Sequence, residues 1–231
     1  MAKKEKKNFL VLGLGYFGAE LAKKLYELGA EVVAVDSDPQ IIESLADEVT
    51  QAIEMNPADD MALKTLGISD YSVCIIARGS NLEDSISIAT TLKDQNAKKI
   101  IARSVSKKHG RILEKLGVDQ IIFPEINIAD TVAEQLVSPV IYDKIILDTD
   151  DNPNNDPDPS KYTIELFRVS DLAGKPVSDY IKKMPKGTKL LAIHRKEEKG
   201  ENIITDFREE TIQPGDLFLV WGPGLRVKEL E

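Results

Sequence analysis

Three glycines near the start of the chain have the spacing of a loop that cradles phosphate groups. In the stretch FLVLGLGYFGAELAKKL, Gly13, Gly15 and Gly18 follow a short apolar run and precede an amphipathic segment. In such a loop the first glycine allows a tight turn, the second lets a pyrophosphate approach the backbone, and the third lets the next helix pack close to a sheet. The helix start offers free N–H groups and partial positive charge. We therefore predict a nucleotide-binding loop, whose remaining members are Leu14, Tyr16 and Phe17.

A carboxylate follows where such sites hold a ribose. The run EVVAVD ends in Asp36, 21 residues after Gly15, and an acid at this place accepts hydrogen bonds from ribose hydroxyls. It also argues against a ligand with a 2′-phosphate, because two negative groups would meet. Ser37 and Asp38 complete this part of the candidate site. The alternative is a domain of the same fold whose site is empty or degenerate.

These residues need a sheet and helices to position them. The first 140 residues alternate short runs rich in Val and Ile with amphipathic, helix-like stretches, which is typical of strands buried on both faces of a parallel sheet. This alternation predicts an α/β domain, a Rossmann-like doubly wound parallel sheet. The expected strands are Asn8–Leu12, Glu31–Val35, Val49–Ile53, Val73–Ala77, Lys99–Arg103 and Gln120–Phe123.

Ligands of such sheets lie outside the carboxyl ends of the strands, and this rule extends the candidate site. The added residues are Asn56, Pro57 and Ala58 after the third strand, Ala77, Arg78 and Gly79 after the fourth, Arg103 at the end of the fifth, and Glu125 after the sixth. The two arginines suit charged phosphates. Ordinary surface charge is the alternative reading of each.

The chain changes character after the first 140 residues. The stretch Asp148–Lys161 holds three prolines and five aspartates, which predicts a solvated linker. A calcium loop starting at Asp148 fails because Pro153 stands where a turn-making glycine is expected. Short strands and turn signals follow, with one helix, and predict a small α+β domain. The expected division is a nucleotide-binding domain over 1–140, a linker over 141–161 and a second domain over 162–231.

Composition excludes several classes of protein. The 231 residues carry a net charge of -9, whereas a general nucleic-acid binder is usually basic. No apolar run reaches the roughly 18 residues needed to span a bilayer. The basic start MAKKEKK resembles a signal peptide, but glycines at phosphate-loop spacing interrupt the apolar run behind it. The single cysteine, Cys74, is expected to be a buried apolar residue, so we predict a cytoplasmic protein.

The sequence shows few residues that could serve as proton-transfer groups in hydride transfer. Of its two histidines, His109 is expected on an exposed helix face and His194 in a strand of the second domain. A Tyr-x-x-x-Lys pair is absent. A dehydrogenase needs a proton-transfer group beside its nicotinamide, so we predict that the protein is not an enzyme. An NAD-dependent oxidoreductase is the alternative, and a nucleotide-sensing transcription factor is disfavoured by the acidic charge.

The motifs together resemble a known family. VVAVDSDPQIIESL, SVCIIARGSNLEDSISIATTLK and KLGVDQIIFPE join the glycine loop in resembling the RCK (KTN/TrkA-N) domain. The tail segments DLAGKPVSDY, GTKLLAIHRKEEKGENI and TIQPGDLFLVWG resemble its companion, the RCK-C (TrkA-C) domain. This resemblance covers nearly the whole chain. It implies a cytosolic regulatory subunit of a Ktr/Trk potassium-uptake system.

The resemblance also implies ligands and partners. Such subunits form homodimers that assemble into an octameric ring, peripheral on the inner face of the cell membrane, under a potassium-translocating membrane subunit. They bind ATP or ADP, with NAD(H) as the alternative, and the nucleotide changes the shape of the ring. Glu125 would help to hold a divalent cation, Mg or Ca. In the second domain, the strand around Ile193–Arg195 would be the place for a cyclic dinucleotide.

One position departs from the family pattern. Tyr16 stands where many ATP-responsive members have an arginine, in GYFG rather than GRFG. Its absence would weaken preference for the triphosphate or let NAD compete, unless Arg78 or Arg103 compensates. The helices expected over Ser106–Leu116 and Ile126–Val137 are candidate dimer elements. The apolar residues of the second are Ile126, Ile128, Val132, Leu136 and Val137, and a purely intradomain role is the alternative.

Overall fold

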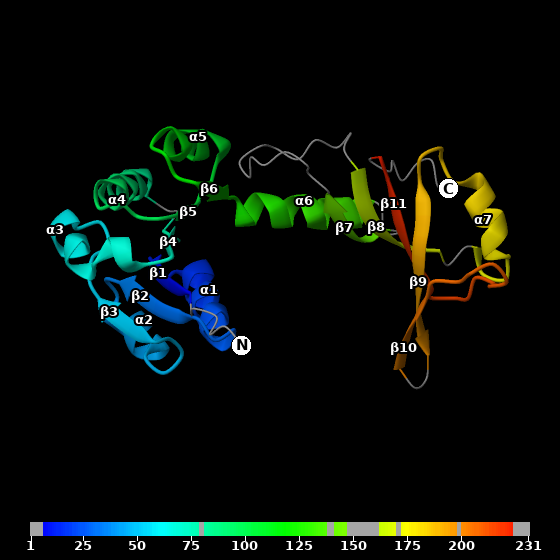
Figure 1. Ribbon diagram of the computed structural model, residues 1–231, viewed down its shortest axis with the longest axis horizontal. Helices are drawn as coiled ribbons and strands as arrows, with labels where there is room; N and C mark the ends of the chain where they lie inside the picture. The colour runs from blue at the N-terminus through cyan, green and yellow to red at the C-terminus, as the bar shows by residue number, and fades with distance from the viewer. Residues whose placement is uncertain are drawn as a thin grey trace, which may run out of the picture. The chain divides into compact units, whose positions relative to one another are not determined.

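The chain forms two compact units, Met1–Asn127 and Ile128–Glu231 (Figure 1). Each unit has its own sheet and its own hydrophobic core. The computed structural model describes residues 7–78, 81–137, 141–146, 162–169, 172–197 and 200–223. The predicted linker Asp148–Lys161 and the predicted site residue Gly79 lie outside these ranges.

The first unit is a parallel sheet of six strands in the order β3-β2-β1-β4-β5-β6. The strand order reverses between β1 and β4, so the crevice of a doubly wound sheet opens there. This topology confirms the predicted fold class. The strands are β1 (Asn8–Leu12), β2 (Glu31–Asp36), β3 (Gln51–Glu54), β4 (Val73–Ile76), β5 (Ile100–Arg103) and β6 (Gln120–Ile122).

Helices cover both faces of this sheet. Val11 faces a cluster with Ala22 of α1 and Leu45 of α2, whereas Leu10 and Leu12 face a second cluster with α3, α4 and α5 (Figure 1). This follows from the strand period of two, which sends successive side chains to opposite faces. The helices are α1 (Tyr16–Glu27), α2 (Pro39–Leu45), α3 (Asp60–Leu63), α4 (Leu82–Asp94), α5 (Lys107–Lys115) and α6 (Pro124–Val137), with 3₁₀ turns η1 (Lys64–Leu66) and η2 (Ile68–Asp70).

Polar side chains set where most of these helices begin. Asp38 accepts a hydrogen bond from Gln40 N at the start of α2, where Pro39 occupies the first helical position. Asn81 caps α4 and Ser106 caps α5 in the same manner. The short α3 and the two 3₁₀ turns were not predicted, because they are too brief to show a helical period.

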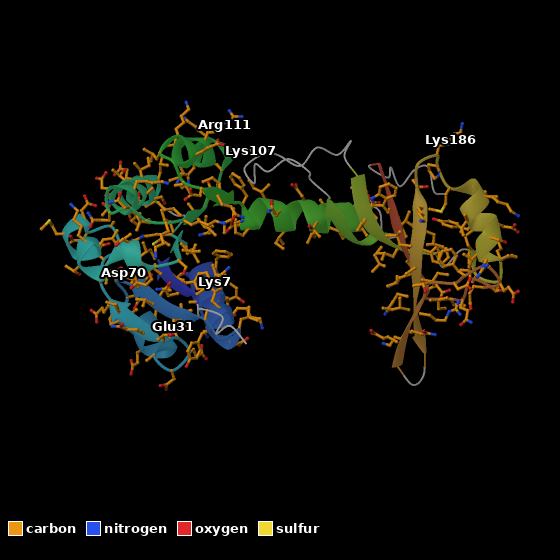
Figure 2. The ribbon with its side chains drawn as sticks, viewed as in Figure 1. Lys7, Glu31, Asp70, Lys107, Arg111 and Lys186 are labelled. Atoms are coloured by element: carbon orange, nitrogen blue, oxygen red, sulfur yellow. The ribbon has the colours of Figure 1, made fainter. Side chains whose placement is uncertain are left out.

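His109 is a correction to the sequence prediction. It was expected at the surface, but it is only 4% exposed, and burial lowers the pKa of its imidazole. The period of α5 places His109, Gly110 and Leu113 on the inner face. Lys107 and Arg111 lie on the outside of the same helix (Figure 2).

Cys74 is buried in β4, as predicted. Its side chain is fully covered, and burial raises the pKa of the thiol to about 12. It therefore acts as a small apolar residue of the core. Among the described residues we find no helix with the length and hydrophobicity that crossing a bilayer requires.

The second unit is an antiparallel sheet of five strands in the order β10-β9-β11-β8-β7. Helix α7 (Val177–Lys183) packs on one face, where Tyr180 meets Phe218 edge to face with ring centroids 5.1 Å apart. The small α+β architecture agrees with the prediction. The strands are β7 (Ile141–Ile146), β8 (Tyr162–Arg168), β9 (Lys189–Glu197), β10 (Gly200–Ile204) and β11 (Leu217–Pro223).

Strand β7 differs from the sequence expectation. Residues 141–146 were assigned to the linker, but they pair antiparallel with β8 and extend the second sheet at its edge. The six-residue run directly precedes the acidic stretch, and such a short run gives little strand signal in the sequence. The sequence also does not indicate which strand it pairs with. The domain limits themselves stay a prediction.

A buried ion pair joins β9 to the loop that precedes β11. Arg195 donates from Nε and Nη2 to the two carboxylate oxygens of Asp216, each at 2.9 Å, and from Nη1 to Glu210 at 2.9 Å. Its Nη2 also donates to the carbonyl of Thr211. These carboxylates, Asp216 first, hold the pKa of Arg195 above its ordinary value. Since Asp216 is fully buried, the pair depends on both partners being present.

We expect Asp216→Ala to destabilise the second unit by about 3–5 kcal/mol, because it leaves the buried Arg195 charge without its main partner. Asp206→Ala is the matched control. It removes the partner of Arg208 from a solvent-exposed pair, in which the side chain of Asp206 is 67% exposed and that of Arg208 is 86% exposed. No measurable change in the free energy of unfolding is expected. Urea unfolding followed by tryptophan fluorescence measures both. Equal urea midpoints for the two variants would contradict a stabilising role of the buried Arg195–Asp216 pair.

Candidate functional site

The glycine loop has the geometry that its spacing predicts. Gly13 follows β1 with φ +91°, and a Cβ there would lie 2.8 Å from Cβ of Arg78. A Cβ on Gly18 would overlap with the carbonyl oxygen of Gly13. By contrast, a Cβ on Gly15 would have no protein atom within 4 Å. The loop is therefore closely packed at Gly13 and Gly18. It is open at Gly15, the glycine that is expected to face a ligand.

Asp36 fastens this loop to β2. Its Oδ2 accepts a hydrogen bond of 2.6 Å from the backbone N–H of Leu14, and its Oδ1 accepts one of 3.1 Å from that of Asp38. Sequence reasoning assigned Asp36 to a ribose and missed its contact with the loop. That contact joins residues 22 positions apart, so no local signal could reveal it.

The remaining loop residues divide into core and surface. The side chain of Leu14 is only 1% exposed and belongs to the core, and the partly buried Phe17 packs against that core. Tyr16, the first residue of α1, is 89% exposed. Its phenol is thus the side chain of this loop that a ligand can reach.

The loop after β3 is a compact turn at the same edge of the sheet. Asn56 Oδ1 accepts a hydrogen bond from Ala58 N at 3.1 Å, and Met55 N donates to the carbonyl of Asp36 at 2.8 Å. Pro57 is buried and Ala58 packs on the core. The side chain of Asn56 is therefore used in shaping the turn.

Both predicted arginines lie at the carboxyl edge, and both are paired with acids. Arg78 follows β4, and its Nε lies 3.0 Å from Oδ2 of Asp84 in α4. Arg103 ends β5, and its Nη2 donates to Oε1 of Glu125 in the first turn of α6. The hydrogen bond from Arg103 is the main cause that lowers the pKa of Glu125. The sequence predicted these arginines as phosphate contacts and did not foresee their partners.

The structure thus brings most predicted residues to one edge of the sheet. The loops after β1, β2, β3 and β4 and the ends of β5 and β6 all open there. Ala77 is only 3% exposed and serves packing, since its Cβ is the side-chain atom nearest to Gly18. No group of three His, Cys, Asp or Glu side chains within the described ranges is placed to hold a metal ion. Glu125 would therefore need oxygen atoms of a ligand to complete a cation site, as Mg²⁺ sites with phosphates do.

Residues 9–124 match the family described as the TrkA-N domain. The chain belongs to this family. The TrkA-N match confirms the resemblance noted in the sequence. It spans the parallel sheet except for Asn8, and it includes the glycine loop, Asp36 and both arginines.

Relatives extend the similarity beyond the TrkA-N domain. The chain is 29% identical to "Ktr system potassium uptake protein C" of Bacillus subtilis over 98% of this chain and 96% of that protein. It is 31% identical to "Ktr system potassium uptake protein A" of Vibrio alginolyticus over 94% and 93%. Both relatives are named as potassium uptake proteins rather than as enzymes.

Solved structures share the fold. The GsuK RCK domain matches all of this chain and 47% of its own, with a TM-score of 0.60 and 16% identity. A GsuK channel bound to NAD matches all of this chain and 40% of its own, with a TM-score of 0.62 and 15% identity. The chain therefore spans less than half of these proteins, and the likeness concerns the fold.

We expect Gly18→Ala to destabilise the TrkA-N domain by about 1–3 kcal/mol, because its new methyl group would overlap with the carbonyl of Gly13. Gly15→Ala is the matched control. Its backbone has φ -57° and open space around it, so its stability should stay within about 0.5 kcal/mol of the unchanged chain. Thermal unfolding followed by circular dichroism measures both. A larger loss in Gly15→Ala than in Gly18→Ala would show that the loop packs differently.

Proposed function

We propose that this chain is a nucleotide-sensing regulatory subunit of a potassium uptake system. One observation carries the proposal. A glycine loop held by Asp36 opens at the point where the strand order reverses, in a chain similar over nearly its full length to Ktr potassium uptake proteins. An adenine nucleotide fits this arrangement, because its phosphates would meet the loop and the start of α1 while its ribose meets Asp36.

Each part of the ligand has a partner of suitable chemistry. The carboxylate of Asp36 has lone pairs left to accept from ribose hydroxyls beside its two backbone donors. Gly15 leaves room for the pyrophosphate. Arg78 and Arg103 supply positive charge farther along the edge. We propose ATP or ADP as the ligand, NAD(H) as the alternative, and Mg or Ca held by Glu125 together with ligand phosphates.

The regulatory step is a shift between two conformations. A ligand can shift such an equilibrium only through different affinities for the two states. ATP and ADP differ by one phosphate, which can reach charged groups that the shorter ligand leaves untouched. A coupling of about 1–3 kcal/mol would change the open population of a membrane partner several-fold.

An oxidoreductase is less well supported. His109 is buried on the inner face of α5, so it is not placed as a proton donor at an open site. The solved structure of the GsuK channel bound to NAD has this fold in a channel protein. A bound NAD would thus not by itself indicate hydride transfer.

Helix α6 supplies the proposed dimer surface. Ile128, Val132 and Leu136 follow one another at every fourth position and are 64%, 46% and 79% exposed. Such a stripe of large apolar side chains on one helix face is typical of an interface. We propose that it pairs with a second copy, that dimers assemble into an octameric ring, and that the ring acts on a potassium-translocating membrane subunit from the cytoplasmic side.

A cyclic dinucleotide in the second unit stays a proposal drawn from the family resemblance. Within the expected stretch, Ile193 is fully buried and Arg195 is committed to Asp216 and Glu210. The side chain of His194 is 31% exposed. It is therefore the residue of this stretch that such a ligand could contact.

We expect ATP and ADP to raise the melting temperature of the full chain and to bind in isothermal titration calorimetry. Asp36→Ala should weaken binding about tenfold or more, since it removes the acceptor for the ribose and an anchor of the loop. Glu31→Ala at the other end of β2 is the control and should bind as the unchanged chain does (Figure 2). Unchanged affinity in Asp36→Ala would place the ligand elsewhere. Hydride transfer to NAD from a common substrate would favour the oxidoreductase.

We expect Val132→Glu to dissociate the proposed dimer, because a charge would be buried in the apolar stripe. Asp130→Lys changes a charge on the opposite side of α6 and should leave assembly intact. Light scattering coupled to size exclusion measures the mass of each. A monomeric unchanged chain would contradict the dimer surface.

A further inference from the structure

The two arginines at the ligand edge share an unusual arrangement. Each is paired with a carboxylate in the first turn of a following helix, Arg78 with Asp84 of α4 and Arg103 with Glu125 of α6. The positive charge that a phosphate would meet at this edge is therefore already neutralised within the chain. A phosphate must compete with an internal carboxylate to reach either guanidinium.

The two pairs differ in how firmly the acid is held. Asp84 is 21% exposed, and its other oxygen accepts a hydrogen bond of 3.0 Å from Nδ2 of Asn81, the residue that caps α4. Glu125 is 55% exposed and thus largely solvated. Solvated ion pairs contribute little to stability, so the Glu125 carboxylate can leave at small cost.

Arg103 also keeps donor capacity beyond this pair. Its side chain is 20% exposed, and its Nε is buried without a hydrogen-bond partner among the described residues. A guanidinium has five N–H donors in a rigid fork that suits phosphate oxygens. A phosphate that approached Arg103 would therefore find donors that Glu125 does not use.

We propose that Glu125 is an internal competitor for phosphate at Arg103, and so sets how much phosphate charge a ligand needs to occupy that arginine. This inference rests on the proposed function. In the ligand-free chain the carboxylate occupies the guanidinium. A ligand phosphate that reaches Arg103 displaces it, whereas a ligand too short to reach Arg103 leaves the pair intact. Glu125 is thus a specificity-determining residue even when no cation is present.

This role predicts a gain of affinity where a role in cation binding alone predicts none. Glu125→Gln keeps the size of the side chain but removes the charge that competes with phosphate. Without divalent cations it should lower the Kd of the ligand that reaches Arg103 by about two- to fivefold. This fold-change corresponds to the free energy that a solvated ion pair typically contributes. If Glu125 served only to hold a cation, the same variant would bind no better.

The experiment is calorimetric titration of the full chain with ATP and with ADP in EDTA, for the unchanged chain, Glu125→Gln, Arg103→Gln and the double variant. Glu31→Gln is the matched control, since it removes one negative charge at the amino end of β2, the opposite edge of the sheet (Figure 2). We expect tighter binding in Glu125→Gln, unchanged binding in Glu31→Gln, and no gain from Glu125→Gln once Arg103 is replaced.

The outcomes separate this inference from the proposed function. If the unchanged chain binds ATP or ADP but Glu125→Gln binds with equal or lower affinity in EDTA, the competition is refuted and the proposed function stands. A gain that persists in the Arg103→Gln background also refutes it, because general charge would then be the cause. If the unchanged chain binds no nucleotide, both are refuted.

Discussion

A carboxylate at the end of β2 holds the backbone of the glycine loop, and the candidate site depends on that hydrogen bond. Asp36 accepts from the N–H of Leu14, while Gly13 and Gly18 let the loop lie against Arg78 and Ala77. These contacts bring the ends of β1, β2 and β4 together around one open position, Gly15. Because the loop is already shaped without a ligand, binding need not be preceded by its ordering.

The charges around this loop are arranged in pairs rather than as free cations. Arg78 and Arg103 each face an acid from the first turn of a later helix, so the charge of each guanidinium is balanced by a carboxylate in the absence of a ligand. A sensor benefits from such pairing, since a ligand then changes which groups interact instead of only adding a contact. Helix α6 carries both Glu125 and the exposed apolar stripe, which places the proposed competitor for phosphate and the proposed dimer surface on one element.

Local features of the sequence were sufficient to predict most of the first unit. The parallel strands are continuous apolar runs, and side-chain caps such as Asp38 and Asn81 mark where helices begin. The prediction of secondary structure failed where an element was too short to show a pattern, and the prediction of burial failed where a helical pattern was misread. Strand β7 covers six residues and was assigned to a linker, and α3 has four. His109 was misjudged because its lysine neighbours outweighed a helical period that pointed it inward.

The sequence by itself determined the class of the fold, the glycine loop and the acid after β2, because these depend on spacing along the chain. Its motifs also resembled those of the TrkA-N family. Only the tertiary structure decided how those residues are used. It joined Asp36 to Leu14, Arg103 to Glu125 and Arg195 to Asp216, pairs separated by 21 or 22 positions. Contacts at such distances depend on how strands and helices pack. Neither the identity of a residue nor its neighbours along the chain specifies the partner that packing brings to it.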